Sequence, residues 1–201
     1  MGKFSFLTIK KEGQSDYRDR GSKFFGYAYP VANVEEAKAR LQLLKKSHPK
    51  ASHFCFAWRF GAEGETARVS DDGEPSGSAG KPIEGQILSR GLTSVLVVVV
   101  RYFGGSLLGV PGLIQAYKTA AAEALDQSGQ VEKTVEHELV IEFDYTLMND
   151  VMMMIRQVDG RIGSQERGLF CRYRLMIPLE QKDRAISLLA DLRGVTMMEN
   201  N

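Results

Sequence analysis

The chain has 201 residues, with 26 Lys and Arg against 25 Asp and Glu, so its formal net charge is +1. This length suits one large domain or two small ones. A hydrophobic content of 43% and a charged content of 25% exclude a disordered tail protein, a collagen-like chain and a coiled-coil rod. The near-zero charge also argues against nucleic-acid binding by bulk electrostatics of the whole chain.

The first 130 residues mix strand and helix patterns. We expect strands at 4–9, 23–29, 53–60 and 93–102, helices at 33–47, 82–89 and 113–126, and loops or turns at 10–22, 61–66, 70–81 and 104–112. Asn33 is expected to cap the first helix. Gly91 is placed to end the second helix in the left-handed conformation. The β-branched run at 93–102 is apolar on both faces, which indicates a central buried strand.

The pattern changes after residue 130. We expect strands at 136–144, 160–164, 169–178 and 194–198 and helices at 145–158 and 180–192. The order β-α-β-β-α-β is ferredoxin-like, so the predicted fold class is α+β. The polar segment 126–130 is the predicted boundary between domains 1–130 and 131–201. The first holds 17 Lys and Arg against 13 Asp and Glu, net +4, and the second holds 9 against 12, net −3.

The two cysteines, Cys55 and Cys171, form neither a CxxC pair nor a dense framework. They are expected to be buried thiols in a reducing compartment. The chain starts with no apolar segment followed by a cleavage site, and the longest apolar run, 95–100, is far too short to span a bilayer. We therefore expect a cytoplasmic protein without a membrane partner.

The loop at 70–81 carries three carboxylates, Asp71, Asp72 and Glu74, and no large apolar side chain. Such a segment belongs at the surface, where sites tend to lie. Its oxygens are of the type that binds Mg²⁺ or Ca²⁺, but the spacing is not that of an EF-hand loop. Neighbouring Ser, Gly and Pro residues suit turns instead. Two interpretations stay open: capping or partner contact, and a functional acid or metal role.

The glycine-rich segment 104–112 follows a buried strand and precedes a helix, where backbone amides can hold an anion. It lacks the Lys of a P-loop, and no GxGxxG is present. One interpretation is a turn whose glycines allow positive φ and close packing. The other is a phosphate site, of RNA for example, assisted by Arg101 and Lys118.

Other side chains favour the core. His53 and Cys55 share one side of a strand but stand about 7 Å apart by strand rise, too far for a nucleophile and its base. His48 and His137 have no neighbours at ligand spacing, so no zinc site is expected. Core packing is also expected for Met148, Met152, Met153 and Met154, and for the aromatic residues Phe4, Phe6, Phe24, Phe25, Tyr27 and Tyr29. The aromatic group would form a base-stacking platform only if it were exposed beside Lys or Arg.

Three segments resemble the IMPACT family, including its bacterial YigZ-type members. They are HFCFAW at 53–58, SDDGEPSGSAGKP at 70–82 and VVVRYFGGSLLGVPGLIQAY at 98–117. The middle segment is highly specific, and the order and spacing agree over about 20–125. Pro111 stands where many relatives have a small residue, and it removes one amide donor from the turn.

The resemblance implies an N-terminal β-α-β domain of the ribosomal-protein domain-2-like type, shared with domain IV of elongation factor G. It implies a C-terminal ferredoxin-like domain resembling others of that factor. Eukaryotic members regulate translation as binding proteins, which implies a similar role here. Carried over residue by residue, the implied functional surface comprises His53, Asp71, Asp72, Glu74, Lys81, Arg101, Gly104 and Gly105.

The leading hypothesis is a non-enzymatic binding or regulatory protein linked to translation, which contacts RNA, the ribosome or a translation-associated protein. It has no catalytic residues, metal or cofactor, and DNA is not an expected partner. The alternative is a divalent-metal-assisted hydrolase or phosphoryl-transfer enzyme using the loop at 70–82 with Lys81 or Arg101. A third hypothesis is a module that binds proteins only.

Overall fold

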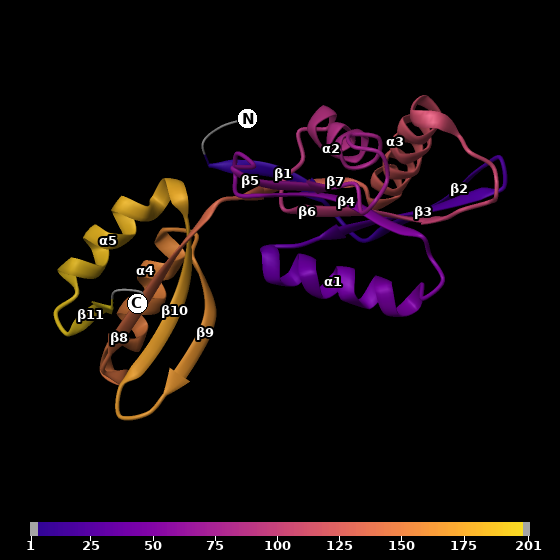
Figure 1. Ribbon diagram of the computed structural model, residues 1–201. Coiled ribbons are helices and arrows are strands. Elements are labelled where there is room, and N and C mark those ends of the chain that lie inside the picture. Colours follow the sequence, from indigo (N-terminus) through magenta and orange to yellow (C-terminus); the bar gives the residue numbers. More distant parts are fainter. Residues whose placement is uncertain (1–3, 199–201) are drawn as a thin grey trace. The chain divides into compact units, whose positions relative to one another are not determined.

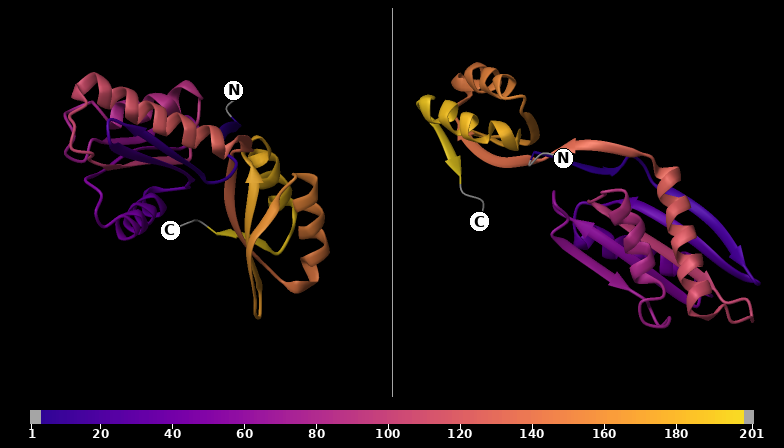
Figure 2. Two further views of the ribbon diagram at one scale, coloured as in Figure 1. Left: turned by 90° about the vertical axis from the view of Figure 1, so that its right-hand side faces the viewer. Right: turned by 90° about the horizontal axis from the view of Figure 1, so that it is seen from above.

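The computed structural model describes residues 4–198 and has a two-domain mixed α/β fold (Figures 1 and 2). Contacts divide the chain into one compact unit over Phe6–Lys133 and a second from Thr134 onward, to which Phe4 and Ser5 also belong. Buried hydrophobic residues form two clusters within the first unit and one within the second. Each unit therefore has a core of its own.

The first unit is built around a five-stranded antiparallel sheet in the order β2-β3-β6-β4-β5. Its elements are β1 (Ser5–Ile9), β2 (Gly13–Asp19), β3 (Ser22–Pro30), α1 (Val34–Ser47), β4 (His53–Phe60), β5 (Thr66–Ser70), α2 (Gly80–Ser89), β6 (Val95–Tyr102), α3 (Gly109–Ser128) and β7 (Gln130–Thr134). Strands β1 and β7 pair in a separate small sheet. Helix α1 lies on one face of the large sheet, and α2 and α3 lie on the other (Figure 1).

Strand β6 is buried on both faces, as its β-branched sequence predicts. Val97 and Val99 belong to the core beneath α2 and α3, whereas Val98 and Val100 belong to the core beneath α1. Its neighbour β4 alternates in the same way, because side chains along a strand point to opposite faces. The two strands thus carry side chains to both layers of the unit.

The exposed loop predicted at 10–22 is wrong, because most of it forms β2. This strand alternates in burial, but its first two inward positions are Gly13 and Ser15, and only the third, Tyr17, has a large side chain that packs on the core. The reason is the close approach of α3: the Ser15 hydroxyl donates a hydrogen bond to the Ala120 carbonyl at 2.7 Å. Strand β5 was also not predicted, and it occupies the opposite edge of the sheet.

Two helices begin earlier than the sequence indicates. Helix α2 begins at Gly80, and α3 begins at Gly109, so the second half of the predicted turn at 104–112 is helical. Proline is tolerated in a first helical turn, where amides have no acceptor within the helix. The predicted cap is confirmed, since Asn33 Oδ1 accepts the Glu36 amide at 2.9 Å. Gly91 also ends its helix as predicted, with φ of 62°.

The second unit has the predicted order β-α-β-β-α-β and an antiparallel sheet ordered β11-β8-β10-β9. Its elements are β8 (Glu136–Phe143), the 3-10 turn Tyr145–Leu147, α4 (Met148–Gln157), β9 (Arg161–Arg167), β10 (Cys171–Pro178), the 3-10 turn Leu179–Gln181, α5 (Lys182–Asp191) and β11 (Val195–Met198). Alternate residues of β10 are buried against both helices, which therefore share one face of the sheet (Figure 2). Three of the four clustered methionines join this core, and Met153 is exposed.

Within residues 4–198, none of the helices combines the length and the apolar character needed to cross a bilayer.

Candidate functional site

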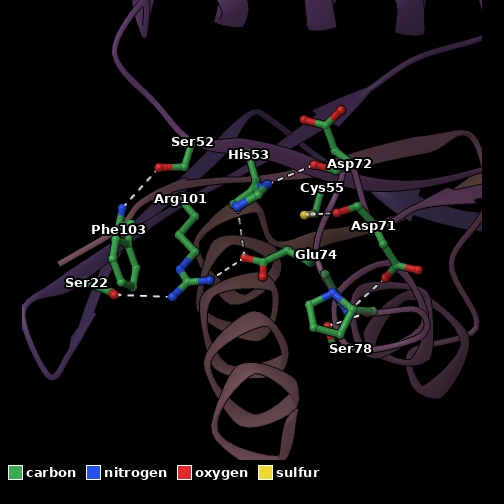
Figure 3. A network of polar contacts seen from close by, with 12 residues as sticks. Ser22, Ser52, His53, Cys55, Asp71, Asp72, Glu74, Ser78, Arg101 and Phe103 are labelled. Carbon is green, nitrogen blue, oxygen red and sulfur yellow. Dashed lines mark hydrogen bonds and ion pairs between the residues drawn. The ribbon is translucent and has the colours of Figure 1, made fainter. Parts of the chain in front are cut away.

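A buried ion pair between Glu74 and Arg101 lies at the centre of a polar network in the first unit (Figure 3). Glu74 Oε1 accepts hydrogen bonds from Arg101 Nη1 at 2.6 Å and from the Tyr117 hydroxyl at 2.7 Å. The side chains of Glu74 and Arg101 are only 4% and 6% exposed. Burying two charges is costly unless they are paired and hydrogen-bonded, so this pair specifies how the loop at 71–79 packs onto the sheet.

The Arg101 side chain is also held between two aromatic rings. Its guanidinium carbon lies 5.4 Å from the Phe24 ring centroid and 5.5 Å from the Phe103 ring centroid. Arg101 Nη2 lies 3.5 Å from the Ser22 hydroxyl, and within residues 4–198 its Nε has no hydrogen-bond partner. Cation–π contacts of this kind strengthen when the cation is removed from water.

His53, the first residue of β4, lies at the edge of this network. Its Nδ1 is 2.8 Å from the Asp72 carbonyl oxygen, which can only accept, so Nδ1 carries a proton. The other nitrogen, Nε2, faces Glu74 Oε1 at 3.8 Å (Figure 3). The hydrogen bond to the Asp72 carbonyl therefore orients the His53 ring, so that Nε2 faces the buried Glu74 carboxylate.

Asp71 organises the start of α2. Its two carboxylate oxygens accept the amides of Gly77, Ala79 and Gly80 at 2.8–3.0 Å. Burial alone would raise the pKa of Asp71, but these amide donors outweigh it and hold the pKa below its usual value. Asp71 is therefore a structural capping residue, which is one of the two interpretations that the sequence left open.

The neighbouring carboxylates have different partners. Asp72 Oδ2 accepts the Phe54 amide at 2.7 Å, whereas Glu74 is paired with Arg101. The three acidic side chains therefore point apart, as Figure 3 shows. Among residues 4–198, no three His, Cys, Asp or Glu side chains are grouped so as to hold a metal ion. The alternative of a metal-assisted enzyme has no ligand set in this loop.

Cys55 is fully buried, and its thiol donates to the Asp71 carbonyl oxygen at 3.0 Å. Burial strongly raises the pKa of this thiol, so it stays protonated. Burial likewise raises the pKa of the Tyr117 hydroxyl. Neither group is an activated nucleophile, which agrees with the expectation that His53 and Cys55 do not form a catalytic pair.

The two glycines proposed for the functional surface have different structural roles. A Cβ added to Gly104 would lie 1.9 Å from the Gly21 carbonyl carbon, so Gly104 permits close packing against the turn between β2 and β3. Its amide donates to the Ser22 hydroxyl at 3.2 Å. Gly105 has a φ of 86° with open space around it. These features correspond to the interpretation of a tight turn.

A hollow of about 340 Å³ lies directly above the network, and we call it the signature hollow. Its polar end is formed by His53, Glu74 and Arg101, and its other lining residues are Pro75, Phe103, Leu107, Leu108, Gly109, Val110 and Leu113. Leu107 is 84% exposed, and Phe103 and Val110 are about half exposed. Exposed apolar side chains that gather around a few polar groups mark a contact surface.

The structure thus brings together three of the eight predicted site residues at the hollow. Asp71 and Asp72 hold the acidic loop beneath it, and Gly104 and Gly105 shape the turn beside it. Lys81 is exposed at the start of α2 and does not line the hollow. Tyr117 and Leu107 were not among the predicted site residues, although both lie within the segment 98–117 that carries the family resemblance.

Comparison with known proteins gives the family directly. Residues 20–125 match the model of the Impact N-terminal domain. The chain belongs to the IMPACT family. The family member YigZ of Escherichia coli is 35% identical over 85% of this chain and 84% of its own. YvyE of Bacillus subtilis is 35% identical over 76% of this chain and 70% of its own. The resemblance stated from the sequence is therefore confirmed.

Two solved structures extend the comparison. One, described as a hypothetical protein, covers 100% of this chain and 99% of its own at 30% identity, with a TM-score of 0.76. The second, described as the two-domain translational regulator Yih1, is 32% identical and covers 64% of this chain and 49% of its own. Its TM-score of 0.37 is too low to support an argument about fold.

Proposed function

We propose that this IMPACT-family protein is a non-enzymatic binding protein linked to translation. Through the signature hollow it contacts the ribosome, RNA or a translation-associated protein in the cytoplasm. The translation link rests on family membership, since the sequence resemblance implies regulation of translation by binding. The surface rests on one observation: exposed apolar side chains line a hollow whose polar end includes a buried ion pair.

The hollow has the composition of a binding surface. Leu107 and Phe103 expose large apolar areas that an isolated soluble protein gains nothing by exposing. The buried pair beneath them fixes the backbone that carries these side chains, so a partner meets a preorganised surface. Rigid anchoring residues beside a small apolar patch are typical of the centre of a protein interface.

The chemistry of the polar groups favours binding over catalysis. The Cys55 thiol is protonated and buried, and Asp71 is fully used in capping amides. Glu74 accepts from Arg101 and Tyr117, which holds it as a structural carboxylate rather than a free base. A nucleophile with a base in hydrogen-bond reach is therefore not formed around the hollow.

Co-sedimentation of the purified protein with ribosomes, at about 50 and 200 mM salt, tests the proposal. We expect association that weakens as salt rises, because contacts to phosphate release counterions. Leu107→Ser should reduce the association, whereas Leu169→Ser should not. The second is a matched control, since Leu169 is 90% exposed and lies in the other unit.

Affinity capture with the full chain from a cell lysate, with and without nuclease treatment, identifies the class of partner. Partners lost on nuclease treatment indicate RNA, and a surviving captured protein indicates a translation-associated protein. Unchanged association of Leu107→Ser, or no association of the wild-type protein at either salt concentration, would contradict the proposal.

We also propose the finer fold assignments that the sequence suggests. The strand order β11-β8-β10-β9 with both helices on one face supports a ferredoxin-like second unit, resembling domains of elongation factor G. The first unit is proposed to be of the ribosomal-protein domain-2-like type, with a domain boundary near residue 130. Contacts support this boundary, since the two compact units separate between Lys133 and Thr134.

A further inference from the structure

A row of aromatic side chains lies on the face of β4 that points away from the signature hollow. Phe54, Phe56 and Trp58 alternate along the strand on the side of α1, and they pack with the core beneath that helix. The Phe56 and Trp58 rings are stacked at 4.8 Å with an interplanar angle of 16°. Trp58 is buried, but Phe54 and Phe56 are only partly covered by α1.

Cationic side chains border this row. Lys38 and Lys45 project from α1, two helical turns apart, and Lys45 Nζ lies 5.7 Å from the Phe54 ring centroid. Arg68 of β5 is the cross-strand partner of Trp58, and its guanidinium carbon lies 5.6 Å from the indole ring. Asp72 is the one acidic residue that lines the groove, and its carboxylate accepts the Phe54 amide. The border is therefore net positive.

A groove of about 200 Å³ lies between α1 and β4. It is lined by Lys38, Leu41, Gln42, Lys45, Phe54, Phe56 and Asp72. This volume is below the roughly 300–1,000 Å³ typical of a site that encloses a whole small molecule. An occupant would therefore insert one flat group and leave the rest outside. The inserted group would contact aromatic rings, and the remainder would pass two lysines.

We propose that this groove binds single-stranded RNA, with a base inserted against Phe54 and Phe56 and its phosphates near Lys38 and Lys45. Aromatic rings combined with a positively charged border are the recurring elements of single-strand binding. The pairing of anionic phosphates with these lysines is the charge complementarity that selects this occupant. The proposal adds a second surface on the opposite face of the sheet, so it does not depend on the signature hollow.

Binding is measured with the full chain and a fluorescein-labelled ten-nucleotide oligo(U) RNA, by fluorescence anisotropy at 50 and 200 mM salt. Trp58, the only tryptophan of the chain, gives an independent signal because it stacks on Phe56. We expect affinity to fall roughly sevenfold over this salt range if the two lysines contact phosphates. Trp58 emission should change when unlabelled oligo(U) is added.

Variants separate stacking from charge. Phe54→Leu and Phe56→Leu keep apolar volume but remove the ring, and each should weaken binding by at least about fivefold. Lys38→Glu combined with Lys45→Glu should abolish binding at 200 mM salt. Lys10→Glu combined with Lys11→Glu is the matched control, since these two exposed lysines lie between β1 and β2 and do not line the groove. Thermal unfolding confirms that each variant is folded.

The proposal would be overturned by no binding at 50 mM salt, by equal losses for the control pair at Lys10 and Lys11 and the pair at Lys38 and Lys45, or by full affinity of both leucine variants. Equally tight binding of double-stranded RNA would also overturn it, because a paired base cannot enter the groove. Ribosome association that survives in the leucine variants would leave the function proposed for the signature hollow standing.

Discussion

Glu74 and Arg101 are 27 positions apart in the sequence, yet their side chains form the most buried ion pair among residues 4–198. Each charge needs the other as its partner, because the loop at 71–79 and the Phe103 ring keep water away from both. Removing one partner leaves the other as an uncompensated buried charge, whereas removing both does not.

We predict that Glu74→Gln destabilises the first unit by about 3–5 kcal/mol. The double variant Glu74→Leu with Arg101→Met should be less destabilised than the sum of the two single changes. Urea unfolding followed by Trp58 fluorescence measures both, since this tryptophan belongs to the first unit. Glu12→Gln is the control: its exposed pair with Arg40 should contribute under about 1 kcal/mol. Additive single effects would contradict the coupling.

A second residue-scale prediction concerns acid sensitivity. Because the folded state lowers the pKa of Asp71, the charged carboxylate stabilises the fold above its ordinary pKa of 3.8. This stabilisation is lost as pH falls through the lowered folded value. Asp71→Asn should cost about 1–3 kcal/mol at pH 7, and the difference in Tm from the wild type should shrink below pH 4. A difference that stays constant down to pH 2 would contradict this role.

At the scale of elements, the turn between β2 and β3 packs directly on the segment that follows β6. Gly104 makes this possible, because its missing side chain leaves room for the Gly21 backbone. The contact joins an edge hairpin of the sheet to the segment 103–107, which carries Phe103 and Leu107. The position of this segment therefore depends on a close backbone approach between two loops.

We predict that Gly104→Ala is the more damaging of two glycine substitutions in this turn. Its Cβ would collide with backbone atoms that cannot move aside, so the cost should exceed the 1–3 kcal/mol typical of overpacking. Gly105→Ala meets open space and should cost only about 1–2 kcal/mol for the left-handed conformation. Urea midpoints compare the two variants, and an equal loss would show that the close approach contributes nothing.

Elements with large apolar side chains were predictable from sequence, as β4 and β6 show, because burial on both faces leaves a clear pattern. Strand β2 was not, since α3 approaches the first two inward positions so closely that only Gly13 and Ser15 fit there. At the site, Glu74 and Arg101 were each predicted from the segments at 70–82 and 98–117. Their pairing, and the hydrogen bond from Tyr117 to Glu74, depend on how distant segments pack, which no local pattern encodes.

At the scale of the whole molecule, the near-neutral charge is the sum of two unlike halves. The first 130 residues carry +4 and the rest carry −3, and the two units have separate cores. A neutral average therefore does not exclude an RNA contact on the first unit, where the lysines of α1 lie.

We predict that a fragment of residues 1–133 folds on its own, because it contains the whole five-stranded sheet and all of β1 and β7 except Thr134. Its free energy of unfolding, measured by urea unfolding followed by Trp58 fluorescence, should agree with that of the full chain within about 1 kcal/mol. Circular dichroism checks that the fragment keeps its secondary structure. A fragment that is unfolded in buffer would show that the second unit is needed for the first to fold.

The two cysteines noted at the start are distributed one to each unit, and both are buried. A thiol reagent can modify each of them only when the surrounding core opens. The rate at which Cys55 is labelled therefore reports excursions of the first unit, and the rate at Cys171 reports those of the second. Without any engineered probe, a single labelling time course resolved by mass spectrometry yields two opening free energies from one chain.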